Sequence, residues 1–169
     1  MASEVDYEPK WEGISTAKLH TPTVDQVWPL LEDFFSLHKW LPGIDTCRQV
    51  EGVDSRLRYC ATTLPTPPNG DGEGVVKWCH EKMLDIDPIG KWLSYEVLDN
   101  NMGFKSYKST MKVLPINDGD DPRSGCMIQW SFLADPVEGI SYEDLVGYLD
   151  VCLQGMAKNM ETALNLKPN

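Results

Sequence analysis

The sequence predicts an α+β fold in which a curved antiparallel sheet of about seven strands wraps around a long C-terminal helix. Three observations lead to it: an opening extended run followed by two short helical stretches, a middle region of short extended runs, and a final segment with apolar residues at helical spacing. Successive strands joined by hairpin-sized connections are antiparallel. Because a curved sheet cannot match a straight helix everywhere, we also expect an internal cavity between them.

The first strand is predicted over residues 10–20, and Pro22 follows it. Residues 23–26 (Thr-Val-Asp-Gln) form a Thr-x-x-Gln capping box. Apolar residues at helical spacing follow the box: Val27, Leu30, Leu31 and Phe34. Pro29 fits badly inside this helix, because proline lacks an N–H donor and clashes with the preceding turn. Either the helix is kinked at Pro29 or it begins after the box, and residues 41–43 (Leu-Pro-Gly) then break the pattern.

The middle of the chain consists of extended runs separated by turns rich in Gly, Pro, Asn and Asp. The predicted strands cover residues 44–51, 56–64, 74–86, 91–98, 106–115 and 124–134. Their spacing is typical of an antiparallel meander.

The last segment is predicted to be a helix of about two dozen residues, because Ser141 is followed by Asp144 three positions later and then by one broad apolar stripe. The stripe comprises Tyr142, Leu145, Val146, Leu149, Cys152, Leu153, Met156, Met160, Ala163 and Leu164. Gly147 and Gly155 interrupt it, each at a cost of roughly 1 kcal/mol relative to alanine. We expect them either to permit close approach to the sheet or to relieve crowding over a cavity.

Length and charge limit the organisation and the partners. The 169 residues predict a single ligand-binding domain over residues 1–169, with residues 1–8 as a flexible N-terminus. The formal net charge of −11 argues against nucleic acid and anionic membranes as partners. No apolar run approaches the ~20 residues of a membrane-spanning helix, so membrane insertion is not expected. We expect a monomer or weak dimer.

The cysteines and histidines indicate neither export nor a metal site. The acidic N-terminus lacks the pattern of a secretory signal, and the five cysteines form no Cys-x-x-Cys pair, so we expect a cytoplasmic protein with reduced thiols packed as small core residues. His20, His38 and His80 lie far apart and outside ligand spacing, so no metal or other cofactor is predicted.

The order of elements, with the residues that fill it, resembles the helix-grip fold of the START and birch-pollen-allergen superfamily, also described as polyketide cyclase-like. Within it the chain is most similar to the plant lachrymatory factor synthase-like family. The similarity spans nearly the whole chain and rests on these runs: Lys10-Trp-x-Gly13, Trp28-x-Leu-Leu31, Asp33-Phe34, Leu37-His-Lys39, Val50-Glu-Gly52, Arg58-Tyr59, Glu81-Lys82, Tyr107-x-x-Thr-Met111, Trp130-Ser-Phe132 and Val137-Glu-Gly139.

This resemblance implies an activity and three site residues. In the family's enzyme an Arg, a Glu and a Tyr inside the cavity rearrange an unsaturated alkyl sulfenic acid into a thial S-oxide. These roles fall on Arg58, Glu81 and Tyr107, which keep the family's local runs. The expected function is therefore an isomerase that acts by proton transfer, without a cofactor, on a small hydrophobic or sulfur-containing molecule in an internal cavity.

The three residue types suit that chemistry. Glutamate can act as acid or base, arginine offers a fixed cationic fork for an oxyanion, and tyrosine adds a neutral donor. Two effects oppose one another at a buried glutamate, because loss of water favours the neutral acid whereas a neighbouring guanidinium favours the carboxylate. Both protonation states stay open at this point.

Strand alternation supports only part of the assignment. Tyr107 shares a face with Ser109 and Met111, and lysines occupy the opposite face, so Tyr107 is predicted to point inward. Arg58 and Glu81 share faces with both apolar and charged residues. The pattern alone favours a solvent-exposed cross-strand ion pair between them, worth tenths of a kcal/mol to about 1 kcal/mol, whereas the resemblance places both inside.

Two further functions compete with the isomerase. The first is a non-catalytic carrier or sensor of a hydrophobic plant metabolite or lipid in the same cavity. Residues 62–65 (Thr-Thr-Leu-Pro) are similar to part of the gate loop of abscisic acid receptors, which share the fold, but Asp45 replaces their ligand-binding Lys and residues 101–103 (Asn-Met-Gly) replace their latch. The second, lipid transfer at membranes, conflicts with the net charge.

Overall fold

The computed structural model describes residues 10–52, 55–64, 74–116 and 125–166, so the N-terminus expected to be flexible (1–8) lies outside the described residues. The elements follow the predicted order. They are β1 (Trp11–Leu19), α1 (Val24–Glu32), the 3₁₀ helix η1 (Phe34–Lys39), β2 (Thr46–Gln49), β3 (Leu57–Leu64), β4 (Val75–Asp87), β5 (Trp92–Asn100), β6 (Tyr107–Pro115), β7 (Cys126–Ala134) and α2 (Tyr142–Leu166).

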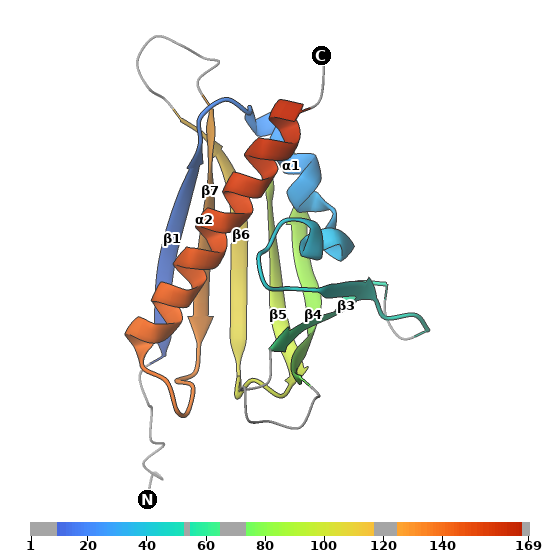
Figure 1. The fold of residues 1–169 in the computed structure, drawn as a ribbon, viewed down its shortest axis with the longest axis vertical. Coiled ribbons are helices and arrows are strands. Elements are labelled where there is room, and N and C mark those ends of the chain that lie inside the picture. The colour runs from blue at the N-terminus through green and yellow to red at the C-terminus, as the bar shows by residue number, and fades with distance from the viewer. Residues whose placement is uncertain (1–9, 53–54, 65–73, 117–124, 167–169) are drawn as a thin grey trace, which may run out of the picture.

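The strands form one seven-stranded sheet with the order β1-β7-β6-β5-β4-β3-β2. All of the neighbouring pairs are antiparallel, as hairpin-sized connections require. Helix α2 crosses one face of this sheet, and α1 lies near the C-terminal end of α2 (Figure 1). The predicted α+β architecture, with two short helices after the first strand, is confirmed.

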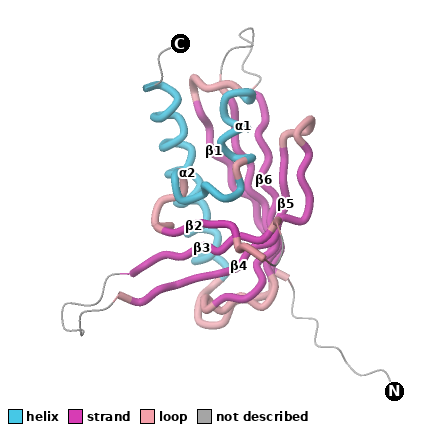
Figure 2. The backbone as a smooth tube through the Cα atoms, turned by 90° about the vertical axis from the view of Figure 1, so that its right-hand side faces the viewer, coloured by secondary structure: helices cyan, strands magenta, loops and turns pink. Residues whose placement is uncertain are grey.

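Curvature of the sheet is concentrated in β4. This strand has 13 residues, and its register against β5 shifts between Cys79 and Glu81 and again between Met83 and Asp85. A β-bulge bends the strand that carries it and increases its twist. In Figure 2 strands β2, β3 and β4 accordingly turn across the direction of β1, β5 and β6. The sheet can therefore reach around α2 on one side.

Helix α1 begins where the capping box predicts. Thr23 accepts a hydrogen bond from the Gln26 backbone N–H at 3.3 Å, and the Gln26 side chain accepts one from the Thr23 N–H at 2.9 Å. The expectation that the helix might begin after the box is therefore wrong. Pro29 lies inside α1 at an exposed position, three residues before the helix ends at Glu32.

Helix α2 also begins at its predicted cap. The Asp144 N–H donates to Ser141 Oγ and the Ser141 N–H donates to Asp144 Oδ2, both at 3.1 Å. The predicted stripe is confirmed along its centre, where these residues are buried against the sheet: Leu145, Leu149, Cys152, Leu153, Met156 and Met160. Tyr142 is exposed instead, and its hydroxyl donates to the Glu12 carbonyl at 2.7 Å, which ties the start of α2 to β1.

The two glycines of α2 have different surroundings, and neither has the role that the sequence predicts, which is close approach to the sheet or relief of crowding over the cavity. A Cβ on Gly155 would lie 2.4 Å from Pro42 Cγ, so this glycine permits a close approach to the turn before β2 rather than to the sheet. A Cβ on Gly147 would meet nothing within 4 Å. Gly147 therefore neither brings the helix closer to the sheet nor relieves crowding.

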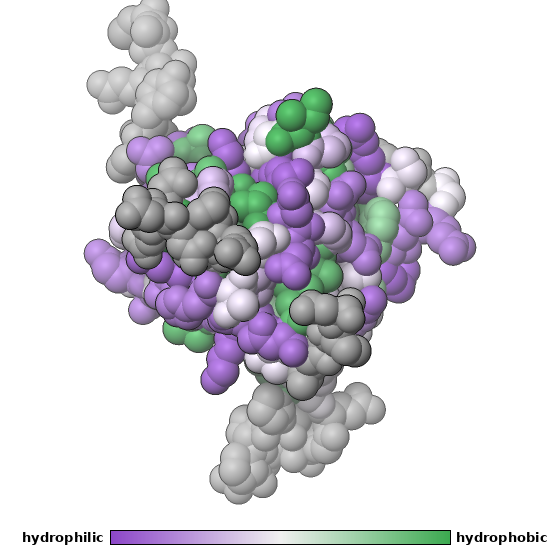
Figure 3. All heavy atoms as spheres, turned by 90° about the horizontal axis from the view of Figure 1, so that it is seen from above, coloured by the Kyte–Doolittle hydropathy of each residue, from purple (hydrophilic) through white to green (hydrophobic). Residues whose placement is uncertain are grey.

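The surface view in Figure 3 is dominated by hydrophilic side chains, with hydrophobic ones in small separate groups. Among the described residues, no helix combines the length and the hydropathy that crossing a membrane requires.

These packing environments predict opposite effects for one substitution made at two positions. Gly147→Ala should stabilise the protein by about 0.5–1 kcal/mol, because alanine favours the helix and meets open space. Gly155→Ala should destabilise it by about 1–3 kcal/mol, because the proline ring cannot move aside without a backbone shift. Urea unfolding followed by circular dichroism measures both changes, and stabilisation by both substitutions would contradict the Pro42 contact.

Candidate active site

A cavity of about 120 Å³ lies between the concave face of the sheet, the turn that follows η1, and α2. Its wall is mostly apolar, with a few polar side chains from β3, β4, β5 and β6. Arg58, Glu81, Tyr95, Tyr107, Trp130 and Leu149 are among the residues that line it. The volume admits several water molecules, since a site for one needs roughly 10–15 Å³. It is also below the ~300–1,000 Å³ typical of sites for drug-sized ligands, so the space suits a small molecule.

The structure brings Arg58 and Glu81 together at this cavity. They are direct cross-strand partners in β3 and β4. Arg58 Nε donates to Glu81 Oε1 at 2.8 Å, and Nη2 lies 2.7 Å from the same oxygen. Their exposures are only 3% and 8%. The ion pair that the strand pattern favours is therefore present, but its expected position on the solvated face is wrong.

The bulges of β4 explain why alternation was ambiguous for Glu81. Between Met83 and Asp85 the register shifts, after which Asp85 is exposed and Ile86 packs against the core. Counting every second residue through the bulge places the charged Asp85 on the face of Glu81, although Asp85 is exposed and Glu81 is buried. On β3, Arg56 precedes the strand and is exposed, so it does not share the environment of Arg58.

The Arg58 guanidinium is enclosed by aromatic rings. Its Cζ lies 3.7 Å from the ring centroid of Phe34 and 5.1 Å from that of Tyr95, and Nη1 donates to the Phe34 carbonyl at 2.7 Å. Burial disfavours the charged form, but the attraction of Glu81, together with smaller contributions from neighbouring Cys and Tyr side chains, outweighs it and raises the pKa of Arg58 above its ordinary value. The site therefore holds a permanent, fixed cation.

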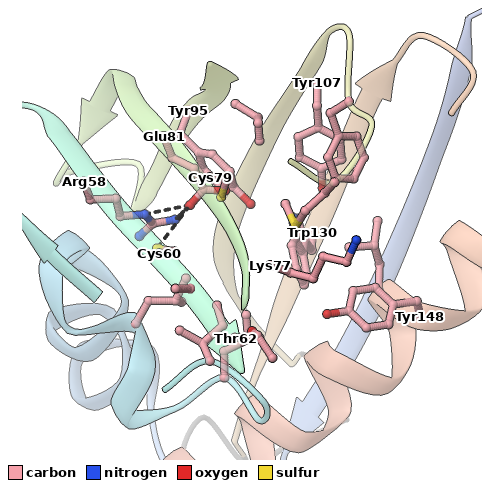
Figure 4. Close-up of a pocket in the computed structure, with 18 of the residues that line it drawn as sticks. Arg58, Cys60, Thr62, Lys77, Cys79, Glu81, Tyr95, Tyr107, Trp130 and Tyr148 are labelled. Atoms are coloured by element: carbon pink, nitrogen blue, oxygen red, sulfur yellow. Dashed lines mark hydrogen bonds and ion pairs between the residues drawn. The ribbon is translucent and has the colours of Figure 1, made fainter. Parts of the chain in front are cut away.

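Tyr107 faces the cavity from β6, as strand alternation predicts. Figure 4 shows it across the cavity from Arg58. Its ring stacks on Phe132, with centroids 5.8 Å apart. Its hydroxyl is buried and makes no hydrogen bond within the described part of the chain. Burial raises the pKa of Tyr107, so the phenol is neutral at physiological pH and has a free hydrogen-bond donor.

Sequence reasoning missed the two aromatic residues that hold Arg58. The sequence indicates Phe34 as part of an apolar helical pattern and of a run shared with the similar family, but it gives Phe34 no role in the site; both its carbonyl and its ring contact the guanidinium. Tyr95 was not singled out, although it alternates with the buried Leu93 and Val97 along β5. That alternation could have placed Tyr95 on the inner face, but nothing local indicates that it lies beside Arg58.

The sequence predicts the cysteines only as small core residues and does not place any of them at the site. Cys60 and Cys79 line the cavity beside the ion pair, and the Cys60 thiol lies 3.7 Å from Glu81 Oε1. Among the described residues, no group of three or more His, Cys, Asp and Glu side chains is placed to hold a metal ion.

The arrangement combines three chemical capacities in an apolar enclosure. Arg58 can stabilise negative charge on a ligand oxygen, the Glu81 carboxylate can accept a proton, and the Tyr107 hydroxyl can donate a hydrogen bond. Such electrostatic interactions are stronger where water is excluded. The site is therefore equipped to bind a small polar group and to move a proton on it.

Comparison with known proteins supports the architecture. Residues 15–164 match the model of the family described as polyketide cyclase/dehydrase and lipid transport. The match runs from within β1 to near the end of α2 and includes all the described residues that line the cavity.

Solved structures show the same fold. XoxI from Bacillus cereus has a TM-score of 0.70 and 23% identity, covering 94% of this chain and 99% of that one. An uncharacterized protein from Bacillus thuringiensis has a TM-score of 0.67 and 21% identity, covering 91% and 98%. A START superfamily protein from Mycobacterium smegmatis has a TM-score of 0.62 and 11% identity, covering 91% and 97%. The predicted helix-grip architecture is confirmed.

Burial of the ion pair predicts strong coupling between its members. Glu81→Leu alone should destabilise the protein by about 3–5 kcal/mol, because it leaves the Arg58 charge buried without its partner. The double variant Arg58→Met/Glu81→Leu should lose less than either single variant. Chemical unfolding of all four proteins closes the cycle. The exposed Lys10–Asp135 pair is the control, and Asp135→Asn should unfold close to wild type. If the free energy of unfolding lost by the double variant equals the sum of the losses in the two single variants, the buried ion pair is contradicted.

The unpartnered hydroxyl of Tyr107 predicts a gain in stability on its removal. Tyr107→Phe should raise the free energy of unfolding by about 1 kcal/mol, since it deletes a buried polar group that makes no hydrogen bond and keeps the ring packing. Thermal unfolding measures the change. A clear loss of stability would show that the hydroxyl has a partner in the folded protein.

Proposed function

The chain belongs to the polyketide cyclase/dehydrase and lipid-transport family. We propose that it isomerises a small, largely apolar molecule by proton transfer inside the cavity. The family supports binding of a small molecule within the helix-grip. The apolar wall and the volume of about 120 Å³ favour a compact substrate over a diacyl lipid.

The proposed substrate is a small alkenyl sulfenic acid, and the product is a thial S-oxide. Support comes from the resemblance to lachrymatory factor synthase-like proteins at Arg58, Glu81 and Tyr107. In this conversion the O–H bond of the sulfenic acid breaks and a C–H bond forms at the alkene carbon farther from sulfur. The C=C double bond becomes a C=S double bond, and no atom is gained or lost.

Each of the three residues has a role in this proposal. The Arg58 guanidinium would bind the sulfenic oxygen and stabilise the negative charge that develops as its proton leaves. Glu81, which is positioned by two contacts from Arg58, would take that proton and deliver it to carbon. The neutral Tyr107 hydroxyl would donate a hydrogen bond to the oxygen from across the cavity.

One observation carries the proposal: a buried Arg–Glu pair and a buried tyrosine hydroxyl without a partner line the same apolar cavity. Burial of polar groups is costly unless they are satisfied. A polar ligand atom between these groups would satisfy the hydroxyl, which is the arrangement expected of a site organised for a substrate.

A coupled assay tests the proposal, with the alkenyl sulfenic acid generated in situ from an alkenyl cysteine sulfoxide by a C–S lyase. Wild type should form the thial S-oxide, detected by gas chromatography and mass spectrometry. Glu81→Gln and Arg58→Leu should lower the rate by about 10²-fold or more, the range of general acid–base and oxyanion contributions. Tyr107→Phe should lower it less. Lys108→Gln, on the exposed face of β6, should match wild type.

The second candidate is a non-catalytic carrier, which the mostly apolar wall also favours. Equal inactivity of wild type and Glu81→Gln, together with binding of small apolar ligands by both, would replace the isomerase with the carrier. Intrinsic tryptophan fluorescence can report that binding, because Trp130 lines the cavity.

A further inference from the structure

Three cysteines form a row across the strands at one end of the cavity. Cys47 of β2 is the direct cross-strand partner of Cys60 in β3, and Cys60 is the direct partner of Cys79 in β4. All three are free and buried. Figure 4 shows Cys60 and Cys79 beside Arg58 and Glu81. The cavity is therefore bordered by thiols that the proposed proton transfer does not use.

The two neighbours of Cys60 are not equivalent. The Val50 N–H donates to the Leu57 carbonyl, which makes that pair a hydrogen-bonded one. Since pair types alternate along an antiparallel ladder, Cys47 and Cys60, three positions away, form a non-hydrogen-bonded pair with Cα atoms about 4.5 Å apart. This separation is within the range of ~4.4–6.8 Å that a disulfide spans.

The other pairing is less favourable. The Met83 N–H donates to the Arg56 carbonyl. By the same alternation Cys60 and Cys79 are a hydrogen-bonded pair, whose side chains stand farther apart. The distance between the sulfur atoms also favours the Cys47–Cys60 pairing, because Cys60 Sγ lies 3.7 Å from Cys47 Sγ. Cys47 is thus the partner that Cys60 can reach with a small side-chain movement.

The surroundings of this pair also promote reactivity. The hydrogen bond donated by the Cys60 thiol lowers the pKa of Cys47 to about 6; burial opposes this effect and the positive charge of Arg58 adds to it. In contrast, burial raises the pKa of Cys126 to about 11. The same hydrogen bond, together with burial, raises the pKa of Cys60. Because the thiolate is the reactive form of cysteine, the proton of this hydrogen bond must move to Cys47 before Cys60 can act as a nucleophile.

The cavity gives access to only one member of the pair. Cys60 is among the described residues that line the cavity, whereas Cys47 is not, and the Cys47 thiol lies 3.8 Å from the Phe34 carbonyl. A molecule that enters the cavity therefore meets Cys60 first, and the size of the cavity restricts it to a small one.

We propose that Cys47 and Cys60 form a redox-active dithiol that reduces a small hydroperoxide in the cavity and closes to a disulfide. In the first step the Cys60 proton passes to Cys47, and Cys60 Sγ attacks one peroxide oxygen. An S–O bond forms, the O–O bond breaks, and hydroxide leaves. Hydroxide then takes the proton from Cys47, whose sulfur attacks the Cys60 sulfenic acid. The S–S bond forms as the S–O bond breaks and the sulfenic oxygen leaves as hydroxide, so the two thiol sulfurs lose two electrons and the peroxide gains them.

This reaction changes the site described above. The disulfide removes the Cys60 thiol proton, which lies beside Glu81 Oε1, and links the edge strand β2 to β3. The inference does not depend on the proposed isomerase, since it requires only a small oxidant and the two thiols.

The test treats the reduced full-length protein with hydrogen peroxide and follows it by intact mass. Wild type should lose about 2 Da as the disulfide forms, and dithiothreitol should reverse the loss. Peptide mapping under non-reducing conditions should identify a Cys47–Cys60 cross-link. Cys47→Ala should instead gain about 16 Da as the Cys60 sulfenic acid, which dimedone traps. Cys126→Ala, at a buried position on β7, should behave as wild type.

Several results would overturn the proposal, among them a cross-link between Cys60 and Cys79, equal oxidation of all five cysteines, or no mass change in folded protein under excess peroxide. Circular dichroism of each variant before treatment establishes that it is folded. Retention of the 2 Da loss by Cys47→Ala would likewise exclude Cys47 as the partner.

Discussion

The arrangement of this protein depends on an ion pair buried inside an apolar enclosure. Removing a guanidinium and a carboxylate from water costs several kcal/mol for each ion, and their attraction repays this only with good geometry and further hydrogen bonds. Here the Arg58 guanidinium is satisfied by Glu81 Oε1, the Phe34 carbonyl and two aromatic faces. Those partners come from η1, β4 and β5, so three separate elements must meet around Arg58 of β3 for the pair to be tolerated.

The curvature of the sheet serves the same requirement. The bulges in β4 turn β3 and β2 toward η1, which brings the Phe34 carbonyl within 2.7 Å of Arg58. They also keep the sheet from packing flat against α2, so that space remains over β5 and β6. Tyr107 borders that space with an unsatisfied hydroxyl. The buried hydroxyl lowers the stability of the protein because it has no partner, and it is free to bind a ligand for the same reason.

The cysteine pair depends on the ion pair as well. Arg58 lies two residues from Cys60 on the same face of β3, and its charge favours the thiolate at Cys47. The same cation that would stabilise a ligand oxygen thus supports thiol chemistry next to it. Proton transfer and thiol oxidation would take place in one cavity. Because the Cys60 thiol contacts Glu81, oxidation of Cys60 should change the proton-transfer rate, and a change at Glu81 should alter the oxidation of Cys60.

Local patterns determined the element order, both capping boxes, the stripe of α2 and the inward direction of Tyr107, because each depends on residues a few positions apart. The resemblance added Arg58 and Glu81 as a pair of interest. Only the tertiary structure decided that this pair lies inside, that Phe34 and Tyr95 enclose it, and that Cys47 and Cys60 meet. These facts depend on strand register and on bulges, which are set by contacts between distant segments. A pattern of period two along one strand does not contain that information.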